Sequence, residues 1–150
     1  MRLRKKKKKK SEEPVVEAPV VATLSDEECF EKVSLFQSFV KMGDWGAAYE
    51  NWLPVYQSCP TLNKAIYTDG AKILDYRYQN ATDENVRKAL RDSIMQLHDD
   101  RIKYFDEAKY PDAYVLGVKA MDYLTYYPED ELALPAYGWL KESVTALGVK

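Results

Sequence analysis

A ten-residue pattern occurs twice in the chain, 47 residues apart. Both copies read Tyr-x-x-Gly-x-Lys-x-x-Asp-Tyr, and the shared positions are Tyr67, Gly70, Lys72, Asp75 and Tyr76 in the first copy and Tyr114, Gly117, Lys119, Asp122 and Tyr123 in the second. Each copy lies in a stretch whose apolar residues recur every three or four positions, as on one face of a helix. Such a repeat is typical of similar helical units that bury their faces against one another, and it predicts an all-α fold.

Capping and breaking residues divide residues 25–148 into six predicted helices. Ser25 and Glu28 form a capping box before the first helix, Gly43 ends it, and Asp44 caps the second. Prolines and polar turns separate the others. The expected helices cover about residues 26–42, 45–59, 62–78, 83–104, 111–127 and 134–147. Three antiparallel pairs, at about 25–59, 62–105 and 111–147, are expected to stack in a right-handed row.

Four single residues refine these boundaries. Thr82 is expected to cap the fourth helix, and Pro111 suits the first turn of the fifth. Gly148 is expected to close the sixth helix. Pro54 falls inside the second helix, where we expect a kink and one missing backbone hydrogen bond.

The segment from the first turn to the end of the second helix carries a more specific pattern. It reads Gly43-Asp44-Trp45-x-x-Ala48-x-x-x-Trp52-x-x-Val55-x-x-x-x-Pro60. Here the chain resembles a tetratricopeptide-repeat (TPR) protein, and residues 29–75 are also similar to uncharacterised helical-repeat proteins of Bacteroidota. The resemblance implies a TPR-like solenoid with Trp52 buried between the first two helix pairs. The chain departs from the family at Phe36, where a small residue is usual, and in the 47-residue spacing, which exceeds the TPR period of about 34.

The resemblance also implies a concave groove lined by the first helix of each pair. The TPR proteins that grip a terminal carboxylate use Lys and Asn at these positions, which this chain lacks. We therefore expect the groove to bind an apolar or aromatic segment of another protein, with tyrosines as anchors. The predicted partner-binding residues are Gln37, Lys41, Tyr67, Ala71, Tyr114 and Val118. In the alternative interpretation, the tyrosines only pack one helix pair against the next.

Few residues in the chain suit catalysis or metal binding. The chain has only one histidine, His98, and most catalytic triads and zinc sites are therefore excluded. We expect His98 to be partly exposed on the fourth helix. There is no glycine-rich phosphate loop and no Cys-x-x-Cys motif. Within the repeated pattern, Lys72 with Asp75 and Lys119 with Asp122 are expected to form i,i+3 ion pairs. We expect a non-enzymatic protein without cofactor or metal.

The first ten residues differ in charge from the rest of the chain. They hold eight basic residues, which leaves 14 basic against 24 acidic residues and a net charge of −10 in residues 11–150. We expect residues 1–24 to be a disordered basic tail and linker, and residues 25–148 to form the folded domain. The tail is either an extension without function or a tether to anionic lipid or nucleic acid. The acidic body argues against a nucleic-acid partner, and no apolar run approaches the ~20 residues that span a bilayer.

Two cysteines bear on where the protein works. Cys29 lies in the first turn of the first predicted helix and Cys59 at the end of the second, so an antiparallel pair brings both to the same end. We predict a disulfide there, with two free thiols as the alternative. A disulfide implies an oxidising compartment, either the periplasm or the cell envelope. In that case we expect the natural chain to carry an export leader in place of the lysine run. Two free thiols imply the cytoplasm.

The expected function is a soluble, non-catalytic scaffold for protein–protein interaction. A structural subunit that packs within its own oligomer or a larger assembly remains the alternative from another class.

Overall fold

The computed structural model describes residues 23–105 and 112–148, and all regular elements in these residues are α-helices. The helices are α1 (Asp26–Met42), α2 (Trp45–Ser58), α3 (Ala65–Asn80), α4 (Glu84–Tyr104), α5 (Asp112–Tyr126) and α6 (Leu134–Leu147). The all-α prediction is therefore confirmed for the described residues. The predicted basic tail, up to residue 22, and Pro111 lie outside them. None of the described helices combines the length and apolar character needed to cross a bilayer.

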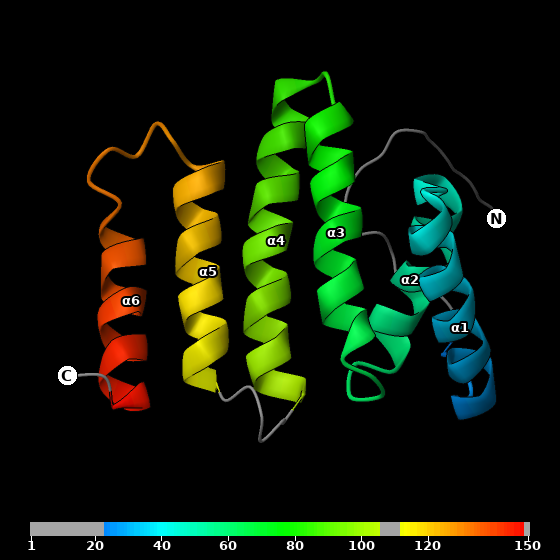
Figure 1. Cartoon of the computed structure of the whole chain (residues 1–150). Coiled ribbons are helices and arrows are strands. Elements are labelled where there is room, and N and C mark those ends of the chain that lie inside the picture. The colour runs from blue at the N-terminus through cyan, green and yellow to red at the C-terminus, as the bar shows by residue number, and fades with distance from the viewer. Residues whose placement is uncertain (1–22, 106–111, 149–150) are drawn as a thin grey trace, which may run out of the picture.

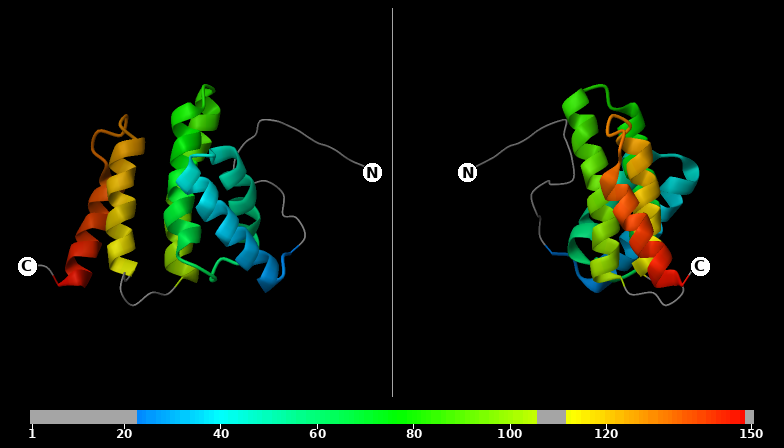
Figure 2. Two further views of the ribbon diagram at one scale, coloured as in Figure 1. Left: turned by 45° about the vertical axis from the view of Figure 1, so that its right-hand side comes forward. Right: turned by 90° about the vertical axis from the view of Figure 1, so that its left-hand side faces the viewer.

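The helices form a row, and helices that follow one another in the chain run in opposite directions (Figures 1 and 2). Packing is densest within the pairs α1–α2, α3–α4 and α5–α6. Between these pairs, α3 contacts both α1 and α2, whereas α5 contacts α4. Within the described residues, no Cα atom of α3 lies within 8 Å of a Cα atom of α5. Helix α4 contacts both α3 and α5 and therefore separates these two helices.

Most of the predicted helix ends are confirmed. The capping box at Ser25 and Glu28 is present, with the Glu28 N–H donating to Ser25 Oγ at 3.1 Å. Gly43 and Gly148 end α1 and α6 with a left-handed φ of 76°, which a residue with a side chain adopts only with strain. Asp44 caps α2 by accepting a hydrogen bond from the Ala47 N–H.

Two helix starts differ from the prediction. Asp83, not Thr82, caps α4, because its carboxylate accepts hydrogen bonds from the N–H groups of the second and third helical residues. Thr82 stands one position too early for this contact. The third helix begins at Ala65 instead of residue 62, since the Asn63 side chain accepts the Ala65 N–H and holds the preceding residues in a turn.

Trp52 is buried in the core, as predicted. It is fully buried, and its Nε1 donates a 2.7 Å hydrogen bond to the carbonyl oxygen of Ile66 at the start of α3. Gly70 of α3 lies against the indole, and a Cβ at this position would come within 2.7 Å of Trp52 Nε1. Because the first repeated pattern has glycine here, α3 can approach α2 closely enough to cover the tryptophan.

The glycine of the second pattern serves a different contact. A Cβ on Gly117 would lie 3.0 Å from Ser143 Oγ, on α6. The Ser143 hydroxyl itself donates to the carbonyl oxygen of Ala113 at 2.6 Å. The two copies therefore share a close-packed glycine, but one meets the preceding helix pair and the other meets its own partner helix.

Candidate functional site

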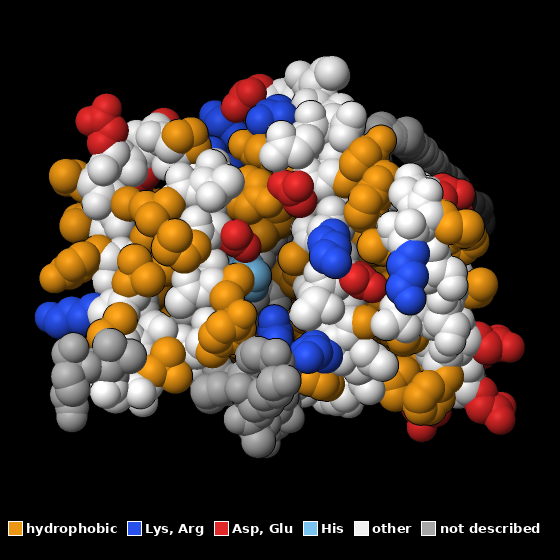
Figure 3. Space-filling model, viewed as in Figure 1, with side chains coloured by type: hydrophobic (Ala, Val, Ile, Leu, Met, Phe, Trp, Pro, Cys, Tyr) orange, Lys and Arg blue, Asp and Glu red, His pale blue; other side chains and the backbone are white. Residues whose placement is uncertain are grey.

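A pocket of about 330 Å³ lies between α3 and α5, with α4 at its base. Its walls are formed by side chains from successive turns of α3 and α5, and its base by one face of α4. The lining residues are Lys64, Tyr67, Thr68 and Ala71 on the α3 side, Tyr114, Val118 and Asp122 on α5, and His98 and Arg101 on α4. We call this pocket the α3–α5 groove. Figure 3 looks onto it, and the histidine colour marks the bottom of the hollow.

The sequence predicted much of this lining. Four of the six predicted partner-binding residues lie in the groove, namely Tyr67, Ala71, Tyr114 and Val118. The other two, Gln37 and Lys41, belong to α1 and do not line it. Burial raises the pKa of Asp69 on α3, and the nearby charges of Lys72 and Lys41 oppose this rise, which places Lys41 beside α3. Since α1 packs directly on α3, no comparable gap separates those two helices.

The two groove tyrosines differ in environment. Tyr67 is 2% exposed, its hydroxyl donates to the carbonyl oxygen of Pro60 at 2.6 Å, and its ring packs 6.1 Å from that of Phe105. Burial raises the pKa of Tyr67, while the positive charge of Arg101 opposes the rise. Tyr114 is 43% exposed. Tyr67 is therefore a core residue with one edge in the groove, whereas Tyr114 is a surface residue of its rim.

His98 does not have the predicted exposure. It is 4% exposed, and its Nε2 lies 2.7 Å from Asp122 Oδ2. The exposure prediction treated α4 in isolation, but α5 packs on α4 and covers this face. Arg101, three residues further along α4, is 7% exposed and lines the same groove. Helical spacing places the two on one face, and this was the signal that could have identified Arg101 as a groove residue.

The predicted i,i+3 ion pairs of the repeated pattern are also wrong. Lys72 lies 3.9 Å from Asp69, and Asp75 instead accepts a 2.6 Å hydrogen bond from the Tyr126 hydroxyl. Lys119 is 8% exposed, and its Nζ lies 2.6 Å from Asp99 on α4. Asp75 and Lys119 therefore make contacts between helices, whereas Lys72 lies near another acid of its own helix.

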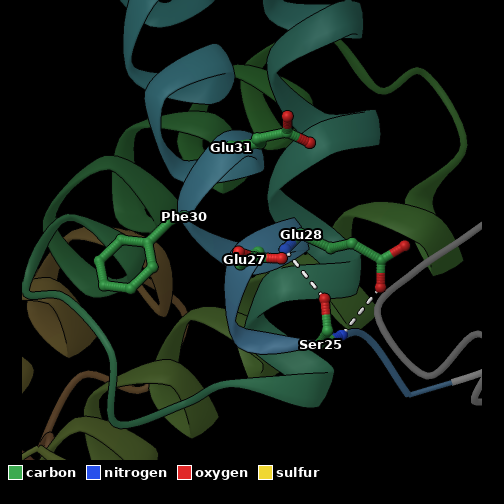
Figure 4. A pocket seen from close by; sticks show the side chains of 5 residues that line it. All are labelled: Ser25, Glu27, Glu28, Phe30 and Glu31. Atoms are coloured by element: carbon green, nitrogen blue, oxygen red, sulfur yellow. Dashed lines mark hydrogen bonds between the residues drawn. The ribbon is translucent and has the colours of Figure 1, made fainter.

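A second pocket, of about 430 Å³, lies at the start of α1 and is lined by Ser25, Glu27, Glu28, Phe30 and Glu31. Figure 4 shows that these side chains spread around the helix instead of converging on one point. Ser25 and Glu28 are engaged with each other, and the hydrogen bond from the Ser25 backbone lowers the pKa of Glu28. Helix capping explains Glu28, as the sequence predicted, and Glu27 lies in the first turn, where a negative charge is favourable to the helix dipole.

The structure joins the two cysteines, as predicted. Cys29 and Cys59 form a disulfide with their Cα atoms 6.6 Å apart, between the first turn of α1 and the residue that follows α2. Cys29 is fully buried in the core. The bond ties together the open end of the α1–α2 pair.

The groove is lined by apolar side chains and tyrosine rings together with Lys64, Arg101 and Asp122. Within residues 23–105 and 112–148, no group of three or more His, Cys, Asp or Glu side chains is placed to hold a metal ion. Comparisons with protein-family models, with curated proteins and with solved structures find no match to this chain.

Proposed function

We propose that this protein is a non-catalytic scaffold of three TPR-like helix pairs, stacked in a right-handed row, which holds an apolar or aromatic segment of another protein in the α3–α5 groove. One observation carries the proposal. Tyr67 and Tyr114 occupy equivalent positions in the two copies of the repeated pattern, as do Ala71 and Val118, and all four line one pocket from opposite walls.

The dimensions and rigidity of the groove support this function. Its volume of about 330 Å³ is at the lower end of the range of about 300–1,000 Å³ for ligand pockets, which suits one or two side chains of a peptide. Tyr67 is fixed by its hydrogen bond to Pro60 and by its packing against Phe105. A wall that is already ordered loses little conformational entropy when a partner binds.

Tyr114→Ala is expected to weaken peptide binding about tenfold or more, because it removes an aromatic anchor from the rim of the groove. The probe is a set of peptides selected from a random phage-displayed library on the wild-type protein, with affinities measured by fluorescence anisotropy. Tyr76→Ala is the matched control, because Tyr76 holds the last position of the same pattern, is 42% exposed and does not line the groove. Selected peptides that bind Tyr114→Ala and wild type equally well would place the binding site elsewhere.

The disulfide supports the location of the protein in an oxidising compartment, since such bonds persist in the periplasm, in the cell envelope or outside the cell. The pairing of Cys29 with Cys59 is the observation behind this part of the proposal.

The outer face of α6 favours a second candidate, a subunit that associates with a copy of itself. The face carries four exposed apolar side chains around Lys141, with Leu134 and Tyr137 each 65% exposed, followed by Val144 and Leu147. In the row, α3 covers α2 and α5 covers α4, but no described helix covers α6 on this side. Among its 14 residues α6 carries one glutamate and one lysine, and the lysine lies on this face, so the face does not share the net negative charge of residues 11–150.

Light scattering during size-exclusion chromatography tests this second candidate. We expect a mass that rises towards that of a dimer with protein concentration, and a monomer at all concentrations for Tyr137→Lys, because a charge would be buried in the interface. Thr82→Lys adds the same charge at an exposed position outside α6 and should dimerise like wild type. A wild-type monomer at every concentration would leave the scaffold as the remaining candidate.

A further inference from the structure

The α5–α6 pair has a small core of its own. The main hydrophobic core of the described residues extends through α1 to α4, and Tyr126 is the one buried residue of the last two helices that belongs to it. Val115 and Ala120 of α5 and Ala136 of α6 are buried but lie outside this core. Packing between α5 and α6 is also closer than packing between α5 and α4. The pair is therefore a unit that meets the rest of the fold along α5.

Polar side chains hold this unit against α4. Within the described residues, three pairs of a carboxylate with a basic side chain cross the interface, and one member of each is at most 13% exposed while the other is at least 32% exposed. They are Lys119 with Asp99, His98 with Asp122, and Arg91 with Glu129, at 2.6–2.7 Å. An exposed ion pair contributes little, but a nearly buried cation that loses its carboxylate is left with an unpaired charge. Docking of the unit therefore depends on these carboxylates.

The apolar part of this interface lies near the end of α5. Tyr126 packs edge-on against Tyr78 of α3, with the ring centroids 5.0 Å apart, and its hydroxyl donates to Asp75 at 2.6 Å. The interfaces within α1–α4 instead bury large apolar side chains completely, as at Trp52. Because burial of apolar area is the main source of stability, we expect the α5–α6 pair to separate at a lower free energy than any interface within α1–α4.

We propose that the α5–α6 pair detaches and unfolds as a unit while α1–α4 stay folded, and that a segment bound in the α3–α5 groove holds the pair in place. Residues 112–148 alone fall below the about 40 residues that a chain needs to fold without a disulfide or a metal. The α1–α4 part keeps its hydrophobic core and the disulfide between Cys29 and Cys59. Cooperative local unfolding of such a unit needs less free energy than global unfolding.

The groove has both walls only while the pair is docked. Tyr114 and Val118 form its wall on α5, whereas Tyr67 and Ala71 belong to α3. A segment that touches both walls binds the docked state and not the detached one, so it favours docking by mass action. Occupancy of the groove and docking of the pair are therefore coupled, and this coupling rests on the proposed function of the groove.

Hydrogen–deuterium exchange of the full, oxidised chain tests the detachment, with mass spectrometry of peptic fragments as the readout. After correction for intrinsic exchange rates, we expect the amides of α5 and α6 to exchange together. They should exchange at least about tenfold faster than the slowest amides of α2 and α3, because they open without global unfolding.

The double variant Asp99→Asn, Glu129→Gln should speed exchange in α5 and α6 about tenfold. Both side chains are exposed, so amides of similar shape replace the carboxylates without a change in any core, while two nearly buried cations lose these partners. Glu31→Gln, Glu50→Gln is the matched control, since it removes the same charge from exposed positions on α1 and α2. This control should exchange like wild type in α5 and α6.

Trp45→Ala separates detachment from global unfolding. Trp45 stacks on Tyr76 of α3, so both residues of this contact stay within α1–α4 when the pair detaches. We expect the slowest amides of α2 and α3 to exchange about tenfold faster in this variant, and those of α5 and α6 to keep their wild-type rates. In a fold that opens only as a whole, both sets of amides would speed up equally.

The coupling is tested with the tightest peptide selected from the phage-displayed library on the wild-type protein. At a free concentration of about ten times its Kd, this peptide should slow exchange in α5 and α6 about tenfold.

The outcomes separate this inference from the proposed function. If α5 and α6 exchange at the rate of α2 and α3 in wild type, and both sets speed up equally in Trp45→Ala, the detachment is overturned and the groove remains a binding site with fixed walls. Equal exchange of the Asp99→Asn, Glu129→Gln variant and its control would overturn the role of the polar pairs. If α5 and α6 detach as expected but no peptide is selected, or the selected peptide does not slow their exchange, the detachment stands, whereas the coupling and the proposed function of the groove both fail.

Discussion

Replacing Trp52 with alanine should lower the free energy of unfolding by about 3–5 kcal/mol, the usual cost of truncating a large buried aromatic residue. The side chain is fully buried, and the residue facing it, Gly70, has no side chain that could move into the space. The substitution also leaves the carbonyl oxygen of Ile66 without its 2.7 Å donor. Equilibrium denaturation in urea, followed by circular dichroism, measures the change.

Trp45→Ala is the matched control, since it removes the same side chain seven residues earlier on α2. Trp45 is partly exposed and stacks on Tyr76 with the ring centroids 5.2 Å apart. Its loss should cost about 1–2 kcal/mol, because less apolar area returns to water. A cost below about 1 kcal/mol for Trp52→Ala would contradict the close contact between α2 and α3, whatever the control shows.

The sequence predicted the helices well because their signals are local. Ser25 with Glu28, Gly43 and Gly148 act within one helical turn, and the structure places each where its spacing predicts. The same locality explains the misplaced cap at Thr82, since Asp83 offers an equally good side chain one position later. Burial of Trp52 was predictable because its position on the apolar stripe agreed with the TPR pattern.

The groove was predicted only in part, because it depends on how α5 sits on α4. Tyr67, Ala71, Tyr114 and Val118 are related by the repeated pattern, so one register placed all four. His98 and Arg101 have no counterpart in that pattern, and their burial arises from the neighbouring helix. The predicted pair of Lys119 with Asp122 failed for the same reason, because Lys119 pairs with Asp99 of α4 instead.

Removing the disulfide is the second large effect that we expect. The bond between Cys29 and Cys59 joins residues 30 positions apart, so the unfolded chain loses the freedom of a loop of this length. In the chain-entropy model this contributes about 3–4 kcal/mol to stability. Reduction of the wild type should lose about this amount, and the double variant Cys29→Ser, Cys59→Ser should lose at least as much.

Comparing the two treatments separates the bond from the side chains it joins. Cys29 is fully buried, so serine there adds the cost of a buried hydroxyl, whereas reduction leaves the sulfur atoms in place. We expect reductant to lower the urea midpoint of the wild type and to leave that of the double variant unchanged. Equal midpoints for oxidised and reduced wild type would show that the bond does not stabilise the fold.

Alkylation without reductant of protein from its native compartment then tests the oxidising environment, where we expect neither cysteine to be labelled because both are held in the disulfide. Labelling of both cysteines would contradict this prediction and indicate that the protein resides in a reducing compartment.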